Sequence, residues 1–348
     1  MKIQELKDLH LLETRMETFP WFVHKFIHYK LDTNLSPSSL LEYSRDFESF
    51  FSWIIQIKSP DNLNYITQMD IGQLEVLTAE NIQEFEEYLL INSMKERTIL
   101  RKIQSLRSLF NYLHDVAEND AGEPLLSKNI FRKITKRRTG SPIETARDIQ
   151  NKVLASNESD DFIDYLRSRY RTENGSNLQA IWNYDINGVR DICIINFMLK
   201  TGLLVSDLIN LNVSDISIHD QQININRQWS GIRSNHSVFF SLSTKTDLLN
   251  YLKIRDTTYR PNHNEAALFL SLPNGQKIGK RITKRGIQSM VIKYATKFGK
   301  PGLTTRQLRH SFGLEHQRQS NYVRTKQQLA YRSTEATEKY QFLTDFVD

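Results

Sequence analysis

Apolar residues at helical spacing dominate the first 140 positions of the chain. Ser36 and Pro37 are residue types that favour the N-cap and the first helical position, and the apolar side chains after them recur every three or four residues. Thr78 is placed to cap a second helix, and a third helix is expected from about Lys95 to His114. The inward-facing positions expected in these helices are Leu40, Tyr43, Phe47, Phe50 and Ile54, then Ile82, Phe85 and Leu89, then Ile99, Ile103, Leu106, Phe110 and Leu113.

The second half of the chain has a mixed pattern. An apolar helix is expected over residues 190–200, and Cys193 lies within it, where a free cysteine behaves as a small core residue. Residues 222–225 and 237–240 alternate as short strands do, with a turn around Ser230-Gly231 between them, and residues 268–270 suggest a further short strand. Helical patterns then continue to the end. The predicted fold class is mainly α with a small antiparallel β-sheet.

The length of 348 residues suits two domains better than one. A basic stretch with turn residues, 133–142, has the composition of a linker. The organisation expected from these signals is an N-terminal extension over 1–18, a helical domain over 19–137, a linker over 138–150 and a second domain over 151–348.

Charge is unevenly distributed along the chain. The net charge is +6 and the isoelectric point is about 9.1. From residue 275 onwards there are 15 Lys and Arg against 5 Asp and Glu, so the rest of the chain carries a net charge of −4. A localised basic surplus is what a surface facing DNA phosphates requires, although a solvated basic face gives the same count.

The composition also indicates in which cellular compartment the protein is expected. No stretch approaches the roughly 20 apolar residues of a membrane helix, and the charged N-terminus lacks an apolar signal-peptide core. A single cysteine cannot form an internal disulfide. We therefore expect a cytoplasmic, nucleoid-associated protein with no membrane partner.

Basic side chains in the first half are candidate DNA contacts. Arg97 and Arg101 lie one helical turn apart on the outer side of the third helix, where both can reach phosphates, and a solvated helix face explains the pair nearly as well. Lys136, Arg137 and Arg138 belong to the linker and are expected to pass along DNA.

Several segments, in the right order from about residue 19 to 342, resemble the tyrosine recombinase, or phage integrase, family. Residues 35–43 and 95–113 resemble the helical core-binding domain. The segments that resemble the catalytic domain are Arg190-Asp191, Thr201-Gly202-Leu203, Asp207-Leu208, 212–215 and Leu308-Arg309-His310-Ser311-Phe312-Gly313. The resemblance implies a core-binding domain and a catalytic-type domain that form a C-shaped clamp around double-stranded DNA.

The resemblance also implies a chemistry. Members of this family cut DNA with a tyrosine that attacks a backbone phosphate and leaves a 3′-phosphotyrosyl bond. Tyrosine is a poor nucleophile unaided, because its reference pKa is near 10. Two arginines, a lysine on a β-turn, and histidines or similar donors stabilise the negatively charged transition state. No metal or other cofactor is required.

Carried over position by position, the family's catalytic set is incomplete in this chain. Tyr340 stands at the position of the nucleophile, Arg309 at the second arginine and Arg306 at the histidine three residues before it. Tyr331 occupies the place of the later His or Trp. Leu204 replaces the first arginine and has nothing to donate. Tyr340 can also be read as a packing residue, and Arg306 and Arg309 as residues that hold a phosphate that is not cut.

The lysine of the family's β-turn is missing as well. The matching segment, 228–236, contains no lysine. Arg227 and Arg233 can lie near the site and bind DNA, but arginine does not readily release a proton. Lys200, one turn before Leu204, is a further candidate to swing toward the site.

Three functional hypotheses follow. The first is an active site-specific recombinase that cuts through Tyr340 with rearranged donors. The second, which the missing donors favour, is a DNA-binding accessory or partner subunit in recombination or integration, impaired when alone. The third is an unrelated helical DNA-binding regulator, against which the ordered motifs argue. We expect assembly as a multimer on DNA, with a second recombinase as a possible partner, and a mobile element as the setting.

Overall fold

The computed structural model describes residues 3–58, 65–135, 140–229, 232–272, 277–331 and 333–347. The chain divides into two compact units, the first containing Met1–Thr139 and the second Gly140–Trp229 with Arg233–Asp348. Each unit is described below by itself.

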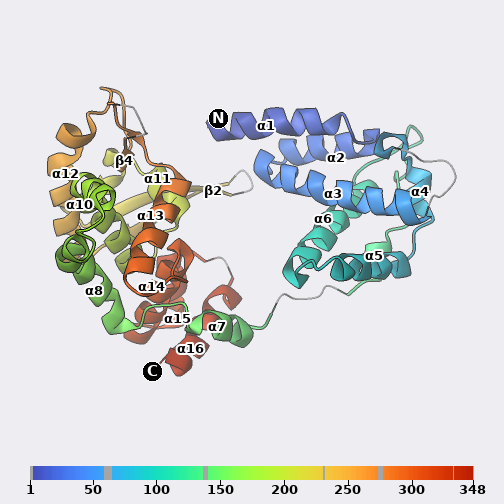
Figure 1. Cartoon of the computed structure of the whole chain (residues 1–348). Coiled ribbons are helices and arrows are strands. Elements are labelled where there is room, and N and C mark those ends of the chain that lie inside the picture. Colours follow the sequence, from blue (N-terminus) through green and yellow to red (C-terminus); the bar gives the residue numbers. More distant parts are fainter. Residues whose placement is uncertain are drawn as a thin grey trace. The chain divides into compact units, whose positions relative to one another are not determined.

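Among the described residues of the first unit, the regular elements are helices, apart from one isolated antiparallel bridge between Glu118 and Pro124 (Figure 1). Its helices are α1 (Ile3–Met16), α2 (Trp21–Asp32), α3 (Pro37–Lys58), α4 (Ile71–Glu75), α5 (Ala79–Ile91) and α6 (Glu96–Asp115), with short 3-10 turns at Ile66–Gln68 and Ile130–Arg132. The predicted inward positions of α3, α5 and α6 all belong to one apolar cluster, within which Tyr43 is partly buried. At the start of α3 the Ser36 hydroxyl accepts a hydrogen bond from the Ser39 amide at 3.3 Å, which confirms the predicted cap.

The N-terminal helix α1, which lies within the expected extension over 1–18, belongs to this unit. It packs against α3, and Leu12 and Met16 are buried in the same apolar cluster. The charged residues of α1 concealed this role in the sequence, because only a narrow apolar stripe faces the core.

The second unit combines ten helices, among its described residues, with two small sheets. The helices are α7 (Pro142–Gln150), α8 (Ser156–Asp164), α9 (Tyr170–Glu173), α10 (Leu178–Thr201), α11 (Val205–Asn210), α12 (Leu242–Tyr259), α13 (Lys284–Lys297), α14 (Thr305–Gln319), α15 (Tyr322–Leu329) and α16 (Glu335–Val347), with a π-helical turn at Tyr165–Arg169 and a 3-10 turn at Val213–Asp215. The mainly α fold with a small antiparallel sheet is thus confirmed.

The strands lie in two sheets. One contains β1 (Ile216–Ser217), β2 (Gln222–Trp229) and β3 (Ile232–Phe239) in that order, with β1 antiparallel to β2 and Ile216 opposite Ile223. The other pairs β4 (Leu270–Ser271) with β5 (Lys280–Arg281), also antiparallel. The strands predicted at 222–225 and 237–240 are present and longer than expected, whereas the turn at Ser230-Gly231 lies outside the described residues.

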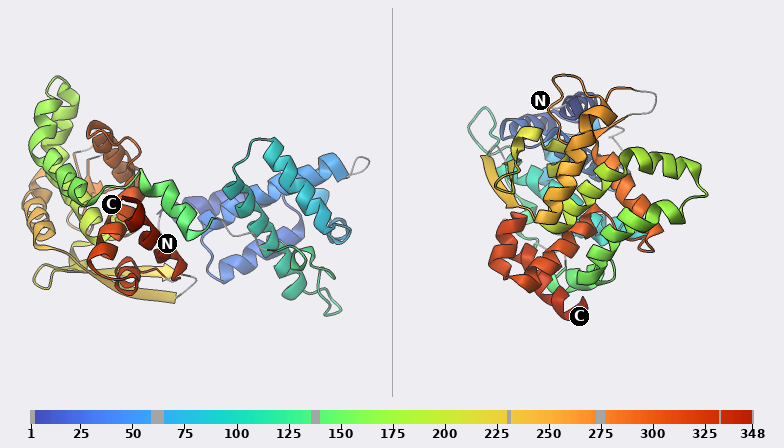
Figure 2. Two further views of the ribbon diagram at one scale, coloured as in Figure 1. Left: turned by 90° about the horizontal axis from the view of Figure 1, so that it is seen from below. Right: turned by 90° about the vertical axis from the view of Figure 1, so that its left-hand side faces the viewer.

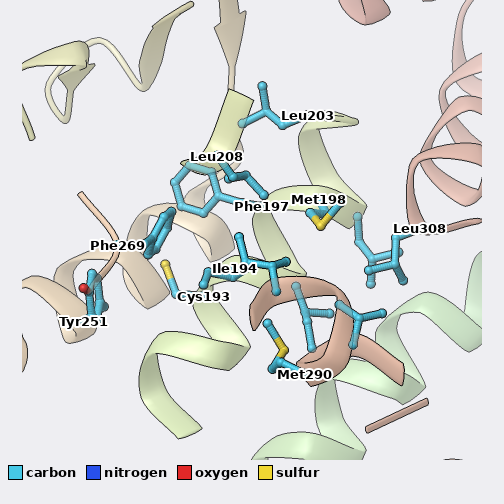
Figure 3. Close-up of a cluster of buried hydrophobic side chains, with 14 of the residues drawn as sticks. Cys193, Ile194, Phe197, Met198, Leu203, Leu208, Tyr251, Phe269, Met290 and Leu308 are labelled. Atoms are coloured by element: carbon cyan, nitrogen blue, oxygen red, sulfur yellow. The ribbon is translucent and has the colours of Figure 1, made fainter. Parts of the chain in front are cut away.

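The main core of the second unit surrounds α10 (Figure 3). This helix contributes Cys193, Phe197 and Met198 to a buried apolar cluster that also contains Phe269 and Leu308. Cys193 is a free, fully buried cysteine, as predicted, and burial raises its pKa well above the usual value, so the thiol is not a reactive group.

Most of the expected linker over 138–150 is in fact helix α7. The Ser141 hydroxyl accepts from the Glu144 amide, and the Glu144 carboxylate accepts from the Ser141 amide at 2.7 Å, which is a capping box that starts the helix. Ala146 and Ile149 are buried against α16. In both Figures 1 and 2 α7 lies beside the C-terminal helices. Helix α7 therefore helps to position α16, which carries Tyr340.

None of the helices in the described ranges combines the length and the apolar character needed to span a lipid bilayer.

Candidate functional site

The corner between α10 and α11 places Leu204 where the family pattern puts an arginine. Helix α10 ends at Gly202, whose φ of 69° is a left-handed conformation that favours glycine. A Cβ at Gly202 would lie 2.3 Å from the Phe312 ring, so no other residue fits here without displacement. Leu204 then caps α11, and its amide donates to the Asp207 carboxylate at 2.9 Å.

The guanidinium of Arg309 is committed to the protein's own backbone. Arg309 is 4% exposed on α14. Nη1 donates to the Gly202 carbonyl, Nη2 donates to the Leu329 carbonyl at 2.7 Å, and Nε lies 3.4 Å from the Tyr331 hydroxyl. Arg309 therefore ties together the ends of α10 and α15, and this structural role takes up one hydrogen bond from each nitrogen.

Tyr340 is enclosed. It is 0% exposed, and its hydroxyl lies 2.9 Å from Nδ1 of His310 and 3.2 Å from the Tyr331 hydroxyl. Its ring packs over Gly313 so closely that a Cβ there would lie 2.4 Å from the tyrosine. Burial raises the pKa of Tyr340 well above its usual value, and the neighbouring Tyr331 raises it further. In this conformation the hydroxyl is neither exposed nor easily ionised.

The two partners of Tyr340 are shifted in different ways. Burial, with the positive charges of Lys339 and the nearby arginines, lowers the pKa of His310 to about 2, so this imidazole is neutral. Burial alone raises the pKa of Tyr331, but the charges of Arg309 and Lys339, together with hydrogen bonds to Tyr340 and Arg309, outweigh burial and lower it. Of the two tyrosines, the one with the more acidic hydroxyl is therefore Tyr331.

A cavity of about 1200 Å³ opens beside these residues. Its described lining includes Leu204, together with Tyr331 and His310, but does not include Tyr340. Its cationic residues are Lys284, Arg306, Arg309, Lys326 and Lys339, and none of the described lining residues is acidic. A concave site with many cations and no carboxylate is suited to bind an anion.

The structure brings Arg306, Arg309 and Tyr331 to this cavity and leaves other candidates elsewhere. Lys200 does not swing toward the site, because its ammonium pairs with Asp160 at 2.6 Å. In the first unit, Arg97 is exposed. The neighbouring Arg101 pairs with Asp46 at 2.5 Å on α3.

The remaining predicted DNA contacts are only partly described. Lys136, Arg137 and Arg138 lie outside the described residues. Arg227 and Arg233 belong to β2 and β3, but their side chains are outside the described set. That these five residues contact DNA remains a prediction.

Three lysines of the cavity escaped the sequence reasoning. Lys284 begins α13, Lys326 lies on α15, and Lys339 directly precedes Tyr340 on α16. The basic surplus after residue 275 was the available signal, but it could not separate cavity lysines from solvated ones. The three cavity lysines could be identified only from the positions of the helices in the structure.

Comparison with known proteins bears on the class. The family model described as "Phage integrase family" matches residues 169–345 of this chain. The model described as "Phage integrase, N-terminal SAM-like domain" matches residues 23–116. The tyrosine recombinase XerS of Streptococcus agalactiae serotype III (strain NEM316) is 30% identical over 351 residues, covering 97% of this chain and 94% of the relative. XerS of Streptococcus pneumoniae (strain CGSP14) is 28% identical over 344 residues, covering 95% and 94%.

Solved structures agree on the fold. The Tn1549 transposon integrase in complex with a circular intermediate DNA gives a TM-score of 0.61 at 15% identity, covering 92% of this chain and 93% of that one. The XerH site-specific recombinase bound to its difH substrate gives 0.58 at 15% identity, covering 88% and 78%. The helices and small antiparallel sheet of this chain are thus those of the recombinase fold. The chain belongs to the phage integrase, or tyrosine recombinase, family.

Proposed function

We propose that this protein binds double-stranded DNA and takes part in site-specific recombination or integration, but cuts DNA poorly when alone and acts as an accessory or partner subunit. The observation that carries the second part is the enclosure of Tyr340, whose hydroxyl contacts His310 and Tyr331 instead of the cavity. A nucleophile held in this way cannot reach a phosphate without movement of α16.

The loss of donors supports the same conclusion. Removing one donor that stabilises a transition state typically costs a factor of about 10² to 10³ in rate. Leu204 provides no donor where the family has an arginine, and each nitrogen of Arg309 already donates or lies close to an acceptor within the protein. Two of the family's charge-stabilising groups are therefore absent or engaged, and the β-turn lysine is missing from the sequence.

DNA binding is supported by the same cavity. Five cationic side chains line it, and none of the residues described along its wall carries a negative charge. Neutralisation of phosphates by these cations releases counterions, so we expect affinity for duplex DNA to fall steeply as salt rises. Affinity that stays equal from low to high salt would contradict this electrostatic account.

The active-enzyme alternative rests on a specific observation as well. Arg306, Lys339 and Tyr331 all line the cavity, and the pKa of the Tyr331 hydroxyl is lowered. If α16 moves on DNA, or if a second recombinase completes the site, these groups are available as substitute donors. A mobile element is the setting that we favour for such a division of labour.

Covalent trapping separates the two possibilities. The DNA site is first selected from random-sequence duplexes by binding to the full chain. A duplex with that site and a nick near the expected crossover then traps any phosphotyrosyl product, which is counted on a denaturing gel. We expect little or no covalent complex from the wild-type chain alone. Robust covalent complex that disappears in Tyr340→Phe would show that substitute donors work and would overturn the accessory reading.

Leu204→Arg tests whether the missing guanidinium limits cleavage. Because the backbone of Leu204 is held by Asp207 at the edge of the cavity, an arginine there is positioned to restore part of the stabilisation. We expect covalent complex to rise above the wild-type level and to disappear again when Tyr340→Phe is added. No gain, in a variant that binds the selected site normally, would mean that Tyr340 or the missing lysine is the stronger limit.

A further inference from the structure

Lys339 carries a buried ammonium at the cavity. It lies on α16 and is 8% exposed, yet its side chain lines the cavity. Its Nζ lies 5.3 Å from the centre of the Tyr331 ring and 5.2 Å from that of Tyr340. No carboxylate in the described part of the chain forms an ion pair with it.

This environment is unfavourable for a cation. Burial lowers the pKa of Lys339, and the charges of Arg306 and Arg309 lower it further, although Tyr331 acts in the opposite direction. A buried charge normally needs a partner, because removing an ion from water costs several kcal/mol. The aromatic rings supply only part of that compensation through cation–π attraction. An anion that enters the cavity would supply the rest.

We propose that Lys339 is the cation that holds a DNA phosphate in this cavity, together with Arg306, and so replaces the charge lost at Leu204 and in segment 228–236. The inference rests on the proposed DNA-binding function and specifies the phosphate ligand within it. It requires no bond to be broken and therefore holds for an accessory subunit and for an active enzyme.

Lys339 is better placed for this task than the other cations. Arg309 already donates to the Gly202 and Leu329 carbonyls. Lys284 is exposed and more hydrated. Lys339 is fixed between two rings, so little conformational freedom is lost when a phosphate binds it. A desolvated, restrained ammonium also gains more from a phosphate than a solvated one, because the local dielectric constant is lower.

A matched control exists in the same unit. Lys293 also lies over tyrosine rings, 4.0 Å from the centre of the Tyr294 ring and 5.9 Å from that of Tyr170, and burial lowers its pKa too. It does not belong to the described lining of the cavity. Lys293→Met therefore removes a ring-bound lysine without touching the proposed phosphate site.

The binding test compares full-length Lys339→Met, Lys339→Arg and Lys293→Met on the selected duplex. Loss of one phosphate contact should weaken binding about tenfold in Lys339→Met at moderate salt and reduce the slope of log K against log salt by about one. Lys339→Arg should remain within about threefold of wild type, and Lys293→Met should bind like wild type. Wild-type affinity and slope in a folded Lys339→Met chain would overturn the proposal.

A second measurement needs no variant and no DNA. The wild-type chain is methylated with formaldehyde and a borohydride, with and without inorganic phosphate at constant ionic strength, and the lysines are compared by mass spectrometry. Phosphate should slow modification of Lys339 several-fold and leave Lys293 unchanged. Equal slowing of both lysines, or none, would contradict the proposal even if Lys339→Met fails to fold. A wild-type chain that binds no duplex would instead defeat the proposed function, while phosphate protection would still decide the role of Lys339.

Discussion

Several cations of the first unit differ from the cations of the second unit's cavity in the partners that they have. In the first unit, Arg101 pairs with Asp46 at 2.5 Å, and Lys102 approaches the same carboxylate at 3.4 Å. Arg132 pairs with Asp115 at 2.6 Å. In the cavity of the second unit, five cations share a lining whose described residues include no acid.

The comparison teaches that a count of basic residues is a poor guide to a phosphate site. A cation in an ion pair with a carboxylate is already partly neutralised. A DNA phosphate must compete with that carboxylate to bind it. Unpaired cations repel one another and become more stable when an anion arrives. The distribution of carboxylates therefore identifies the second unit's cavity more clearly than the distribution of lysines and arginines does.

The largest effect is expected at Arg309, the cavity cation whose guanidinium is hydrogen-bonded to the protein's own backbone. Arg309→Ala removes charge-assisted bonds to the Gly202 and Leu329 carbonyls and leaves buried acceptors unpaired, so we expect the second unit to lose about 3 kcal/mol or more of unfolding free energy. DNA binding should weaken on every sequence tested, because the ends of α10 and α15 are released. Urea unfolding followed by circular dichroism measures the first effect. Unchanged stability with lost DNA binding would show that Arg309 is primarily a phosphate ligand.

The next effect is a dependence of the unfolding free energy on pH, which arises from His310. Since the pKa of His310 is about 2 in the folded chain, against an ordinary value of 6.5, the unfolded chain binds the extra proton below pH 6.5. The stabilisation is thus present above pH 6.5 and is lost as pH falls, by up to about 1.4 kcal/mol per pH unit. Between pH 6.5 and 5 this amounts to about 1.7 kcal/mol, because the unfolded histidine is only half protonated at pH 6.5.

His310→Asn is the control for this pH effect. Asparagine can keep an acceptor near the Tyr340 hydroxyl but does not titrate, so its stability should vary less with pH than that of wild type. Some dependence should remain because burial also lowers the pKa of His316. Parallel curves for the two proteins in urea titrations at several pH values would mean that His310 takes up its proton as readily in the folded chain as in the unfolded chain.

Helices α3, α5 and α6 of the first unit could be predicted because each buries a continuous apolar stripe. Spacing of three and four residues identified the core faces of α3, α5 and α6, and Ser36 marked where α3 begins. The same logic failed for α1 and α7, whose buried positions are few. Leu12 and Ala146 are buried only because α3 and α16 lie opposite them, and that information is not local.

The candidate site divides in the same way. Spacing within a helix and alignment to a family pattern brought Arg306 and Arg309 to one site and identified Leu204 as a lost donor. The enclosure of Tyr340 was not accessible, because it depends on packing over Gly313 from another helix. Lys339 carried no signal either, since a lysine beside a tyrosine is common and only tertiary burial makes it unusual.

The smallest expected effect compares one exposed arginine from each unit. Arg306 lines the cavity and pairs with no carboxylate among the described residues, whereas Arg101 already contacts Asp46. Arg306→Ala should therefore weaken DNA binding a few-fold to tenfold on all sequences and lower the salt slope by about 0.9, the contribution of one neutralised phosphate. Arg101→Ala should change affinity less than threefold and leave the slope nearly unchanged, because its ion pair must break before it can serve a phosphate. Titrations of both variants on one duplex at four salt concentrations measure the two slopes. Equal losses of slope would mean that DNA displaces Asp46 from Arg101, and the contrast between paired and unpaired cations would then no longer identify the phosphate-binding surface.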